Sequence, residues 1–578
     1  MRQYGGVGGE LGQLADRYWD TVLAASPNLA TLVGDHRFDD RVEDLSMSAE
    51  QDLTASFVAL REQVSGLDSA AGSESENITR RLLLGELDRW IAHLRWRPSE
   101  MAWDHLEGVH ASLLTLVPQF TAPEPEHARA LLGRFRQVGG LLDSAMNRFR
   151  HGVAAGRTPA RVVIERSISQ LDGYLASPLD RDPFATLAGP TGWSSETAWR
   201  GDLNDVTRET VRPALRRYRD MLADELLPAA RSEDRAGLCW LGDDGADIYA
   251  RLLRHHTTLD DADPDRIHDL GRTQIARLRE QYALLGERVF GATDTSDIVQ
   301  RMREDPGLRY RDGHQILTDA RRCLENAAAR AGDWFGRLPR SGCEIAAVPD
   351  FLAPDVPAAY YYPPAADGSR PGTYYVNQHA PSDRCRFETA AVAYHEAIPG
   401  HHLQLALAAE LDHLPRFQRE SFANTAFVEG WGLYAELLAD EIGLYTDDLD
   451  RLGMLTGDSL RSARLVVDTG IHAKGWTRDQ AIDYMLANVP AGLTEITVEV
   501  DRYIAMPGQA VAYKIGQLEI LRHRSIARER LGAGFDIAAF HDRILGSGSI
   551  SLPVLAELAT TVEPTRHIAA RHPPAGPS

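Results

Sequence analysis

The sequence is poor in cysteine, with four in 578 residues, and no two of them have the C-x-x-C spacing. A disulfide framework usually needs more cysteines in a shorter chain, and a thiolate zinc site usually shows closely paired cysteines. The sequence therefore predicts neither kind of site, and we expect the four thiols to be reduced.

Long apolar runs and an excess of basic residues are also missing. No stretch approaches the roughly 20 apolar residues that span a bilayer, and residues 1–20 lack the apolar core of a signal peptide. The 83 acidic residues outnumber the 62 basic ones and give a formal net charge of -21. Such a charge disfavours nucleic acids and anionic membranes as partners. We therefore expect a cytoplasmic protein that binds neither.

Most of the chain instead shows the pattern of α-helices. Between residues 78 and 94, for example, apolar residues recur every three or four positions, which places them on one helix face. Strand-like runs are rare, so the predicted fold class is mainly α, in one domain over residues 1–562 with a flexible tail at 563–578. The ranges expected to be rich in helix are 10–25, 78–96, 127–150, 207–230, 265–285, 316–336, 385–412, 420–443, 450–472, 478–488 and 509–530.

One segment, TYYVN at residues 373–377, departs from the helical trend. It is rich in β-forming residues and lies between Pro371 and Pro381, so it predicts a very small β element, a short edge strand. An exposed edge could pair with an extended substrate, which makes Asn377 a candidate substrate-binding residue. The alternative is a buried aromatic strand that binds nothing.

The segment HEAIPGHH, which begins at His395, contains the residue types of a zinc motif at an unusual spacing. In the familiar H-E-x-x-H motif the histidines lie about 6 Å apart along one helix face. Here Pro399 takes the place of the second histidine, and on a regular helix His401 would lie about 9 Å along the axis and about 120° around it. Because Pro399 and Gly400 both break helices, we expect a kink that absorbs the extra residues. His401 is the preferred second ligand, and His402 is the alternative.

A third ligand is available in the segment FVEGWGLYAE, where Glu429 interrupts an otherwise apolar face. An unpaired buried carboxylate is costly, and metal binding would relieve that cost. Two histidines and one glutamate leave an open position for water, as in a catalytic zinc site. Glu436 lies two turns later and could support the site from behind, or it could be an ordinary solvated or ion-paired glutamate. With Glu396 as general base, the pattern predicts a Zn²⁺-dependent hydrolase.

Four segments, HEAIPGHHLQ, FVEGWGLYAE, RLVVDTGIHAKGWT and DRYIAMPGQAVAYKIG, resemble the successive signatures of the bacterial family catalogued as domain of unknown function 885. The resemblance extends from about residue 27 to about residue 560. That family is similar to the helical gluzincin metallopeptidases, which include oligopeptidases, carboxypeptidases and angiotensin-converting enzyme. The resemblance implies a large helical fold with two lobes around a cleft. It also implies His395, His401 or His402, and Glu429 as zinc ligands and Glu396 as general base.

Helical gluzincins commonly use a downstream tyrosine or histidine to stabilise the oxyanion of the intermediate. Tyr513 is the best candidate here, because a phenol can donate a hydrogen bond without competing as a zinc ligand. Tyr503 is the alternative and a candidate for substrate binding, although either tyrosine could be a core aromatic residue. His472 could also face the cleft as a catalytic residue. Three arginines could receive a substrate carboxylate: Arg461, Arg464 and Arg502.

The expected function is hydrolysis of an amide bond in a short peptide or peptide-like substrate. A specialised small-molecule amide hydrolase or tailoring enzyme of secondary metabolism on the same scaffold is an alternative, because a fold does not decide the substrate. A non-catalytic metal-binding protein is a second alternative, and the presence of Glu396 beside the expected ligands argues against it. The sequence predicts no oligomeric state.

Overall fold

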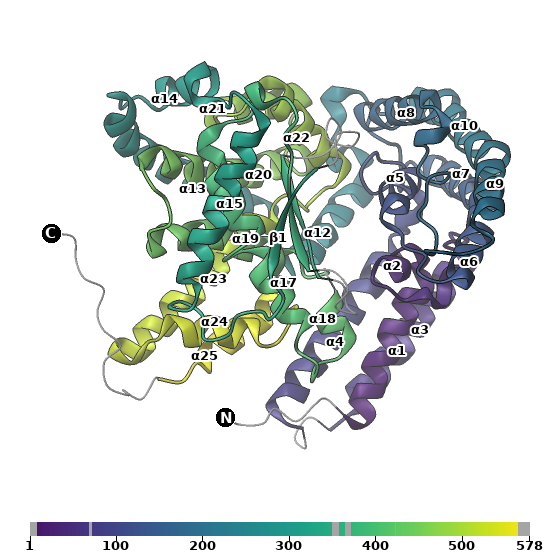
Figure 1. The fold of residues 1–578 in the computed structure, drawn as a ribbon, viewed down its shortest axis with the longest axis horizontal. Helices are drawn as coiled ribbons and strands as arrows, with labels where there is room; N and C mark the ends of the chain where they lie inside the picture. The colour runs from purple at the N-terminus through teal and green to yellow at the C-terminus, as the bar shows by residue number, and fades with distance from the viewer. Residues whose placement is uncertain (1–7, 69–71, 349–357, 365–370, 422, 565–578) are drawn as a thin grey trace.

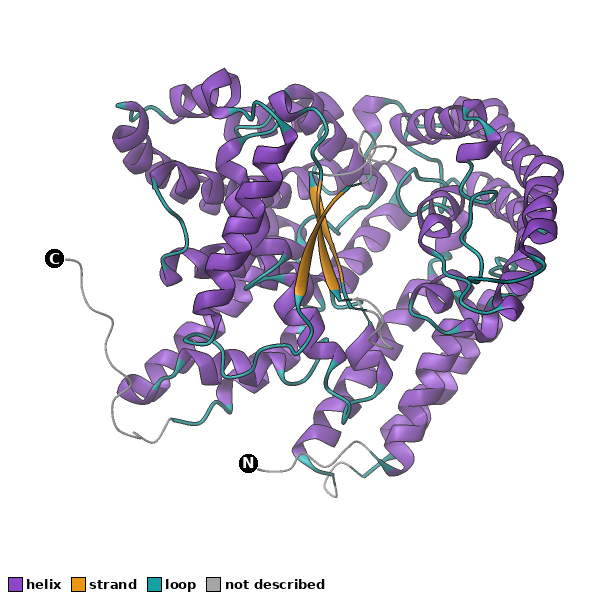
Figure 2. Cartoon of the chain, viewed as in Figure 1, coloured by secondary structure: helices purple, strands orange, loops and turns teal. Residues whose placement is uncertain are grey.

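The computed structural model of the protein is mainly helical, with one small sheet near its centre (Figure 2). The structure describes all residues except 1–7, 69–71, 349–357, 365–370, 422 and 565–578. The predicted fold class, mainly α with a very small β element, is confirmed. The tail predicted at 563–578 lies, from residue 565 onward, outside the described residues.

The helices before residue 230 gather on one side of the molecule. In Figure 1 they are coloured purple to blue and lie to the right of the sheet or, for α4, below it. Helix α4 begins with a capping box, in which Ser73 and Glu76 each bond to the other's backbone amide. The helices of this group are α1 (Gly9–Ala25), α2 (Pro27–Leu32), α3 (Met47–Gly66), α4 (Glu74–Arg95), α5 (Val109–Leu116), α6 (Pro125–Phe135), α7 (Val138–Ala154), α8 (Arg161–Ala176), α9 (Glu196–Val206), α10 (Arg212–Met221) and α11 (Leu227–Ala229).

The later helices form the larger group, in which α13 packs along α20 and α19 packs along α23. Glycines allow the second of these contacts, since a Cβ on Gly430 of α19 would lie 2.5 Å from the backbone of Gly516 of α23. The helices of this group are α12 (Asp243–Thr257), α13 (Pro264–Phe290), α14 (Thr295–Glu304), α15 (Gly313–Ala331), α16 (Thr389–Glu396), α17 (His401–Ala409), α18 (Arg416–Glu420), α19 (Thr425–Ile442), α20 (Asp448–His472), α21 (Arg478–Asn488), α22 (Leu493–Ala505), α23 (Ala512–Leu531), α24 (Ile537–Leu545) and α25 (Leu552–Thr560).

The sheet has three strands, β1 (Cys343–Ala347), β2 (Ala359–Tyr362) and β3 (Gly372–Val376), in the order β1–β3–β2. β3 pairs in parallel with β1 and antiparallel with β2. The prediction of an edge strand at 373–377 is therefore wrong, because both edges of β3 are occupied and neither is free to pair with a substrate.

Tyrosines on the sheet alternate between its two faces, as strand geometry requires. Tyr361 of β2 lies opposite Tyr374 of β3, and the Tyr361 hydroxyl reaches His402 of α17. Tyr374 is buried on this same helix-covered face. The side chains of Tyr360 and Tyr375 occupy the other face, where their rings stack with centroids 5.1 Å apart. The β segment thus matches the alternative of a largely buried aromatic strand.

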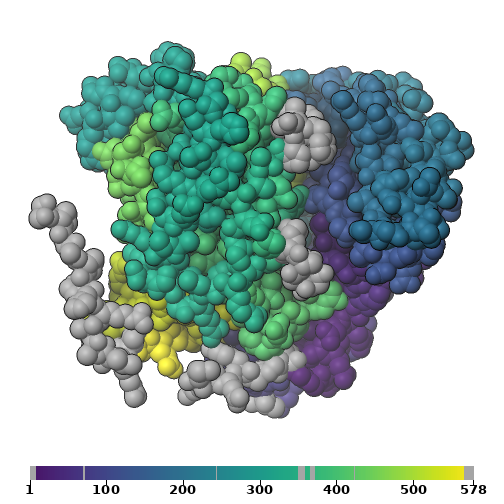
Figure 3. Space-filling model, viewed as in Figure 1, coloured from purple at the N-terminus to yellow at the C-terminus, as the bar shows by residue number. Residues whose placement is uncertain are grey.

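One large apolar core runs through both helical groups, from Leu11 in α1 to Val562 after α25, and a smaller cluster surrounds α12. Distant segments also meet through polar contacts, since Thr79 of α4 donates a hydrogen bond of 2.6 Å to Gln418 of α18. Figure 3 shows the two groups side by side on the viewed face. Within the described ranges, no helix is both long and apolar enough to cross a membrane.

Candidate metal centre

The HEAIPGHH segment forms the end of α16 and the start of α17. α16 ends one residue after His395, and α17 begins at His401. Between them the chain leaves the helical conformation, and the peptide bond before Pro399 is cis. A Cβ on Gly400 would lie 1.8 Å from the carbonyl oxygen of His395, so this close return of the chain requires glycine. The expected break is present, and it places the His395 and His401 rings with centroids 4.7 Å apart.

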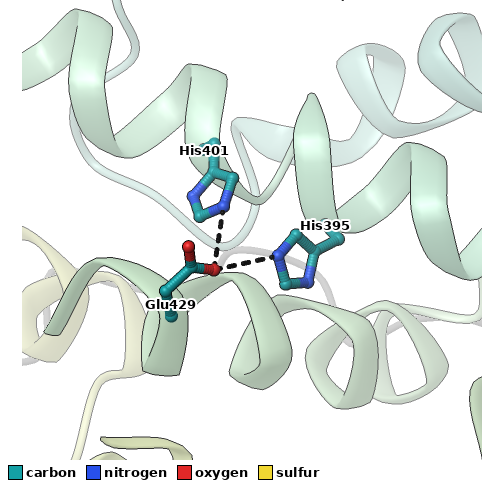
Figure 4. A group of neighbouring side chains, drawn as sticks. All are labelled: His395, His401 and Glu429. Atoms are coloured by element: carbon teal, nitrogen blue, oxygen red, sulfur yellow. Dashed lines mark ion pairs between the residues drawn. The ribbon is translucent and has the colours of Figure 1, made fainter. Parts of the chain in front are cut away.

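Glu429 of α19 reaches both histidines from the opposite side. Its Oε2 atom lies 3.5 Å from Nε2 of His395 and 3.5 Å from Nε2 of His401. Figure 4 shows the three side chains converging from three helices. One ligand atom from each residue lies within 4.8 Å of the other two, and no other such group of three occurs in the described part of the chain.

This donor set fits a zinc ion. Zinc ligands in tetrahedral sites lie about 2.1 Å from the metal and therefore about 3.4 Å from one another. The two separations of 3.5 Å match that value. Two imidazoles and one carboxylate would fill three positions and leave a fourth for water or substrate, as catalytic zinc sites do. His395, His401 and Glu429 would therefore hold the metal.

Glu436 contacts the ring nitrogen of His395 that does not face Glu429. Its Oε1 lies 2.8 Å from Nδ1 of His395, and both side chains are buried. The bond fixes the imidazole with Nε2 turned towards Glu429, an arrangement that typically orients metal-binding histidines. On the ring's other side, a Cβ on Gly432 would lie 2.6 Å from Nε2 of His395. The ring is thus held between a carboxylate and a glycine of α19.

The electrostatics of the three residues show strong mutual attraction. Burial alone would lower the pKa of His395, but Glu429 and Glu436 outweigh it and raise that pKa to about 10. Burial would likewise raise the pKa of Glu429, yet hydrogen bonds from His395 and His401 hold it well below its usual value. A group of donors that attracts protons this strongly also suits a divalent cation, which would replace the protons.

Glu396 follows His395 directly and is half-buried at the end of α16. Burial raises the pKa of its carboxyl group, while the charges of His401 and His395 oppose that rise. No hydrogen bond ties this carboxylate to any of the described side chains. It is therefore available to accept a proton beside the metal ligands, which is the role predicted for it.

His402 does not join this group. Its Nδ1 lies 2.9 Å from the Tyr361 hydroxyl, and burial lowers its pKa to about 4. The side chain points to the sheet and ties β2 to α17. Of the two alternatives left open by the sequence, the structure brings only His401 to Glu429.

Tyr513 lies at the start of α23, one turn before Gly516, which contacts α19 next to Glu429. Arg502 donates a hydrogen bond of 3.3 Å to its hydroxyl oxygen. A guanidinium can only donate, so the phenol keeps its own proton for another acceptor. Both tyrosines are buried, but Tyr503 donates its proton to Glu499 at 2.6 Å. Tyr513 thus fits the role of oxyanion donor better than Tyr503 does.

Two further candidates are engaged with backbone. His472 is buried, its Nδ1 accepts from the amide of Leu238 at 3.2 Å, and its Nε2 lies 2.9 Å from the carbonyl oxygen of Tyr503. Both ring nitrogens are therefore used, and the imidazole has none left for a substrate. Asn377 is 1% exposed, and its side-chain oxygen accepts from the amide of His379. Both residues shape the scaffold around the centre.

Sequence reasoning missed three residues that shape the site: Gly432, Tyr361 and Glu499. Gly432 lies three residues after Glu429, which puts it on the same helix face. That spacing was the only available signal for it. Tyr361 and Glu499 belong to segments whose neighbours cannot be read from local pattern.

Comparison with known proteins identifies the family. The family model described as "Bacterial protein of unknown function (DUF885)" matches residues 27–558. No curated protein matches the chain. The crystal structure of a "putative lipoprotein" from Colwellia psychrerythraea is similar over 95% of this chain and 98% of its own, with a TM-score of 0.89 and 24% identity. A "putative lipoprotein of unknown function" from Shewanella oneidensis is similar over 96% and 100%, with a TM-score of 0.73 and 18% identity. These likenesses establish the fold, and the cytoplasmic location stays a prediction.

Proposed function

The chain belongs to the bacterial family DUF885, and we propose that it is a zinc-dependent hydrolase that cleaves an amide bond in a short peptide or peptide-like substrate. The observation that carries the proposal is the convergence of His395, His401 and Glu429, whose ligand atoms lie within 4.8 Å of one another. Their chemistry is that of a catalytic rather than a structural zinc site, because only three protein ligands are present. The gluzincin-type cleft is part of the same proposal.

Each group around the centre has a defined task. A bound zinc ion would supply a Lewis acid and lower the pKa of a water molecule towards about 7. Glu396 accepts the proton of the attacking water and then delivers it to the leaving amine. Tyr513 donates its free hydroxyl proton to the developing oxyanion, while Arg502 holds the phenol oxygen. Glu436 keeps Nε2 of His395 directed at the centre.

Zinc content and turnover of the purified protein test the proposal. We expect about one zinc per chain in the wild type, loss of that zinc in His401→Gln, and its retention in His402→Gln, because only His401 reaches Glu429. His402→Gln is the matched control, since it removes the neighbouring histidine of the same helix.

Turnover of an acylated peptide library separates the remaining alternatives. Glu396→Gln should keep zinc and lose about 10²- to 10⁴-fold in rate, the usual contribution of a general base. Turnover of a single small amide, with no peptide cleaved, would instead favour a specialised small-molecule hydrolase. Stoichiometric zinc without turnover of any substrate would show a metal-binding protein, and equal zinc content in all variants would refute the site itself.

A further inference from the structure

Three arginines surround the ring of Tyr513. The guanidinium carbon of Arg464 lies 4.6 Å from the ring centroid and that of Arg461 lies 5.8 Å from it. Arg502 donates to the hydroxyl oxygen of the same residue. Three positive charges therefore surround one phenol.

Among the residues that the structure describes, only one carboxylate forms an ion pair with these arginines. Glu499 pairs with Arg464 at 2.7 Å and lies 3.7 Å from Arg502. Arg461 forms no ion pair with any of the described residues. Its one hydrogen bond is a long one, 3.4 Å from NH1 to the carbonyl oxygen of Gly457, and its buried Nε has no partner in the described structure.

Two other carboxyl groups lie near the cluster without pairing with it. Burial raises the pKa of Glu107 to about 7, and Arg502 is near enough to oppose that rise. Burial also raises the pKa of Glu495, and Arg461 is among the charges that oppose it. The side chains of Glu107 and Glu495 are exposed to solvent. Solvent therefore reaches the neighbourhood of Arg461 and Arg502, which are themselves half-buried.

Arg461 also lies close to the groups that would perform the chemistry. A Cβ added to Gly457, one turn earlier on α20, would lie 3.4 Å from a guanidinium nitrogen of Arg461 and 2.5 Å from Oε2 of Glu436. Glu436 in turn holds His395. Arg461 is therefore connected to the candidate metal centre through Gly457 and Glu436.

We propose that Arg461 and Arg502 bind a carboxylate of the substrate, so that the enzyme acts on amides with a free carboxylate close to the scissile bond. The Arg461 guanidinium is half-buried and has a buried Nε with no partner in the described structure. A carboxylate offers two acceptors that match such donors. The main chain of a peptide carries one carboxylate, on its C-terminal residue. The substrates are therefore peptides cleaved near the C-terminus, or N-acyl amino acids. This inference rests on the proposed hydrolase function.

Acetylated dipeptides, each compared as the free acid and as the C-terminal amide, test the inference. For the wild type we expect kcat/KM to be about 100-fold higher for the acid, mainly through KM, because loss of a desolvated charge pair typically costs that much. Arg461→Gln should remove most of this preference by slowing the acid alone, and Arg461→Lys should keep part of it. Arg451→Gln, on the same helix but paired with Asp440 and Asp448 at the surface, is the matched control.

Equal kcat/KM for acid and amide in the wild type would overturn the inference. So would an Arg461→Gln variant that slows both substrates equally, since that result would show a structural role. Calorimetric binding of the same dipeptides to zinc-loaded Glu396→Gln separates this inference from the hydrolase proposal. Selective binding of the acid, with no turnover by the wild type, would support the carboxylate site and refute the hydrolase proposal. Turnover of acid and amide at equal rates would support the hydrolase proposal and refute the carboxylate site.

Discussion

Replacing Gly432 with alanine should damage the candidate metal centre, although Gly432 is not itself one of the proposed ligands. The added Cβ would lie 2.6 Å from Nε2, 2.7 Å from Cε1 and 3.0 Å from Cδ2 of His395. To reach an ordinary contact of 3.4 Å, ring and helix must separate by about 0.8 Å. Metal–ligand distances tolerate only about 0.2 Å. Glu436 prevents the ring from retreating, and the contact of Gly430 with Gly516 prevents α19 from moving.

We therefore expect Gly432→Ala to lower zinc affinity about 10- to 100-fold and to cost about 1–3 kcal/mol of stability through overpacking. Competition with a chelator measures the zinc affinity, and urea unfolding of the metal-free protein measures the free energy of unfolding. Gly201→Ala is the control, because that helical glycine has nothing within 4 Å of a Cβ and should gain up to about 1 kcal/mol. A Gly432→Ala variant that binds zinc within twofold of the wild type would refute the placement of the ion at His395.

Two further predictions concern the hydroxyl of Tyr513 and the carboxyl of Asp468. Tyr513→Phe should lower kcat about 10²- to 10³-fold and leave zinc content unchanged, and a proportional rise in KM instead would contradict its role as oxyanion donor. Burial raises the pKa of Asp468 to about 7 despite bonds from Tyr249 and the Gly508 amide, whereas an unfolded aspartate titrates near about 3.9. Its stabilising contribution is therefore complete below about pH 4 and is lost as the pH rises through 7. Unfolding of Asp468→Asn between pH 4 and pH 8 should show a smaller fall in stability with pH than the wild type, and an unchanged slope would refute the assignment.

The helical part of the fold could be predicted because its signals are local. The periodic spacing of apolar residues identified α4 and α20 within a few residues of their ends. The prediction merged α6 with α7 because the break at Arg136 and Gln137 carries neither proline nor glycine. Helices without a clear apolar face, such as α3, with three buried hydrophobic residues among its 20, were missed.

The position of β3 could not be predicted, because it depends on partners far along the chain. The segment 373–377 was recognised as a strand from its own residues, and its flanking prolines suggested an edge. Its two neighbours, β1 and β2, begin at Cys343 and Ala359. The sequence patterns of β1 and β2 are too short and weak to predict strands that pair with β3. Only the structure shows that both edges of β3 are occupied.

Local sequence patterns do not decide whether His401 or His402 is the proposed second metal ligand. Both histidines follow Gly400, and successive positions at the start of a helix point about 100° apart. The identity of the ligand therefore depends on the angle at which α17 leaves the break, and contacts of the break itself set that angle. The backbone of Gly400 lies against the His395 carbonyl, and Tyr361 of the sheet takes His402 as its partner. Tyr361 of β2 thus holds His402 on the side of the sheet, while the break before α17 turns His401 towards Glu429. Tyr361→Phe removes the hydroxyl that bonds to His402 and should free that side chain without moving His401. We therefore expect the variant to keep its zinc. Loss of the metal would show that the sheet also orients His401.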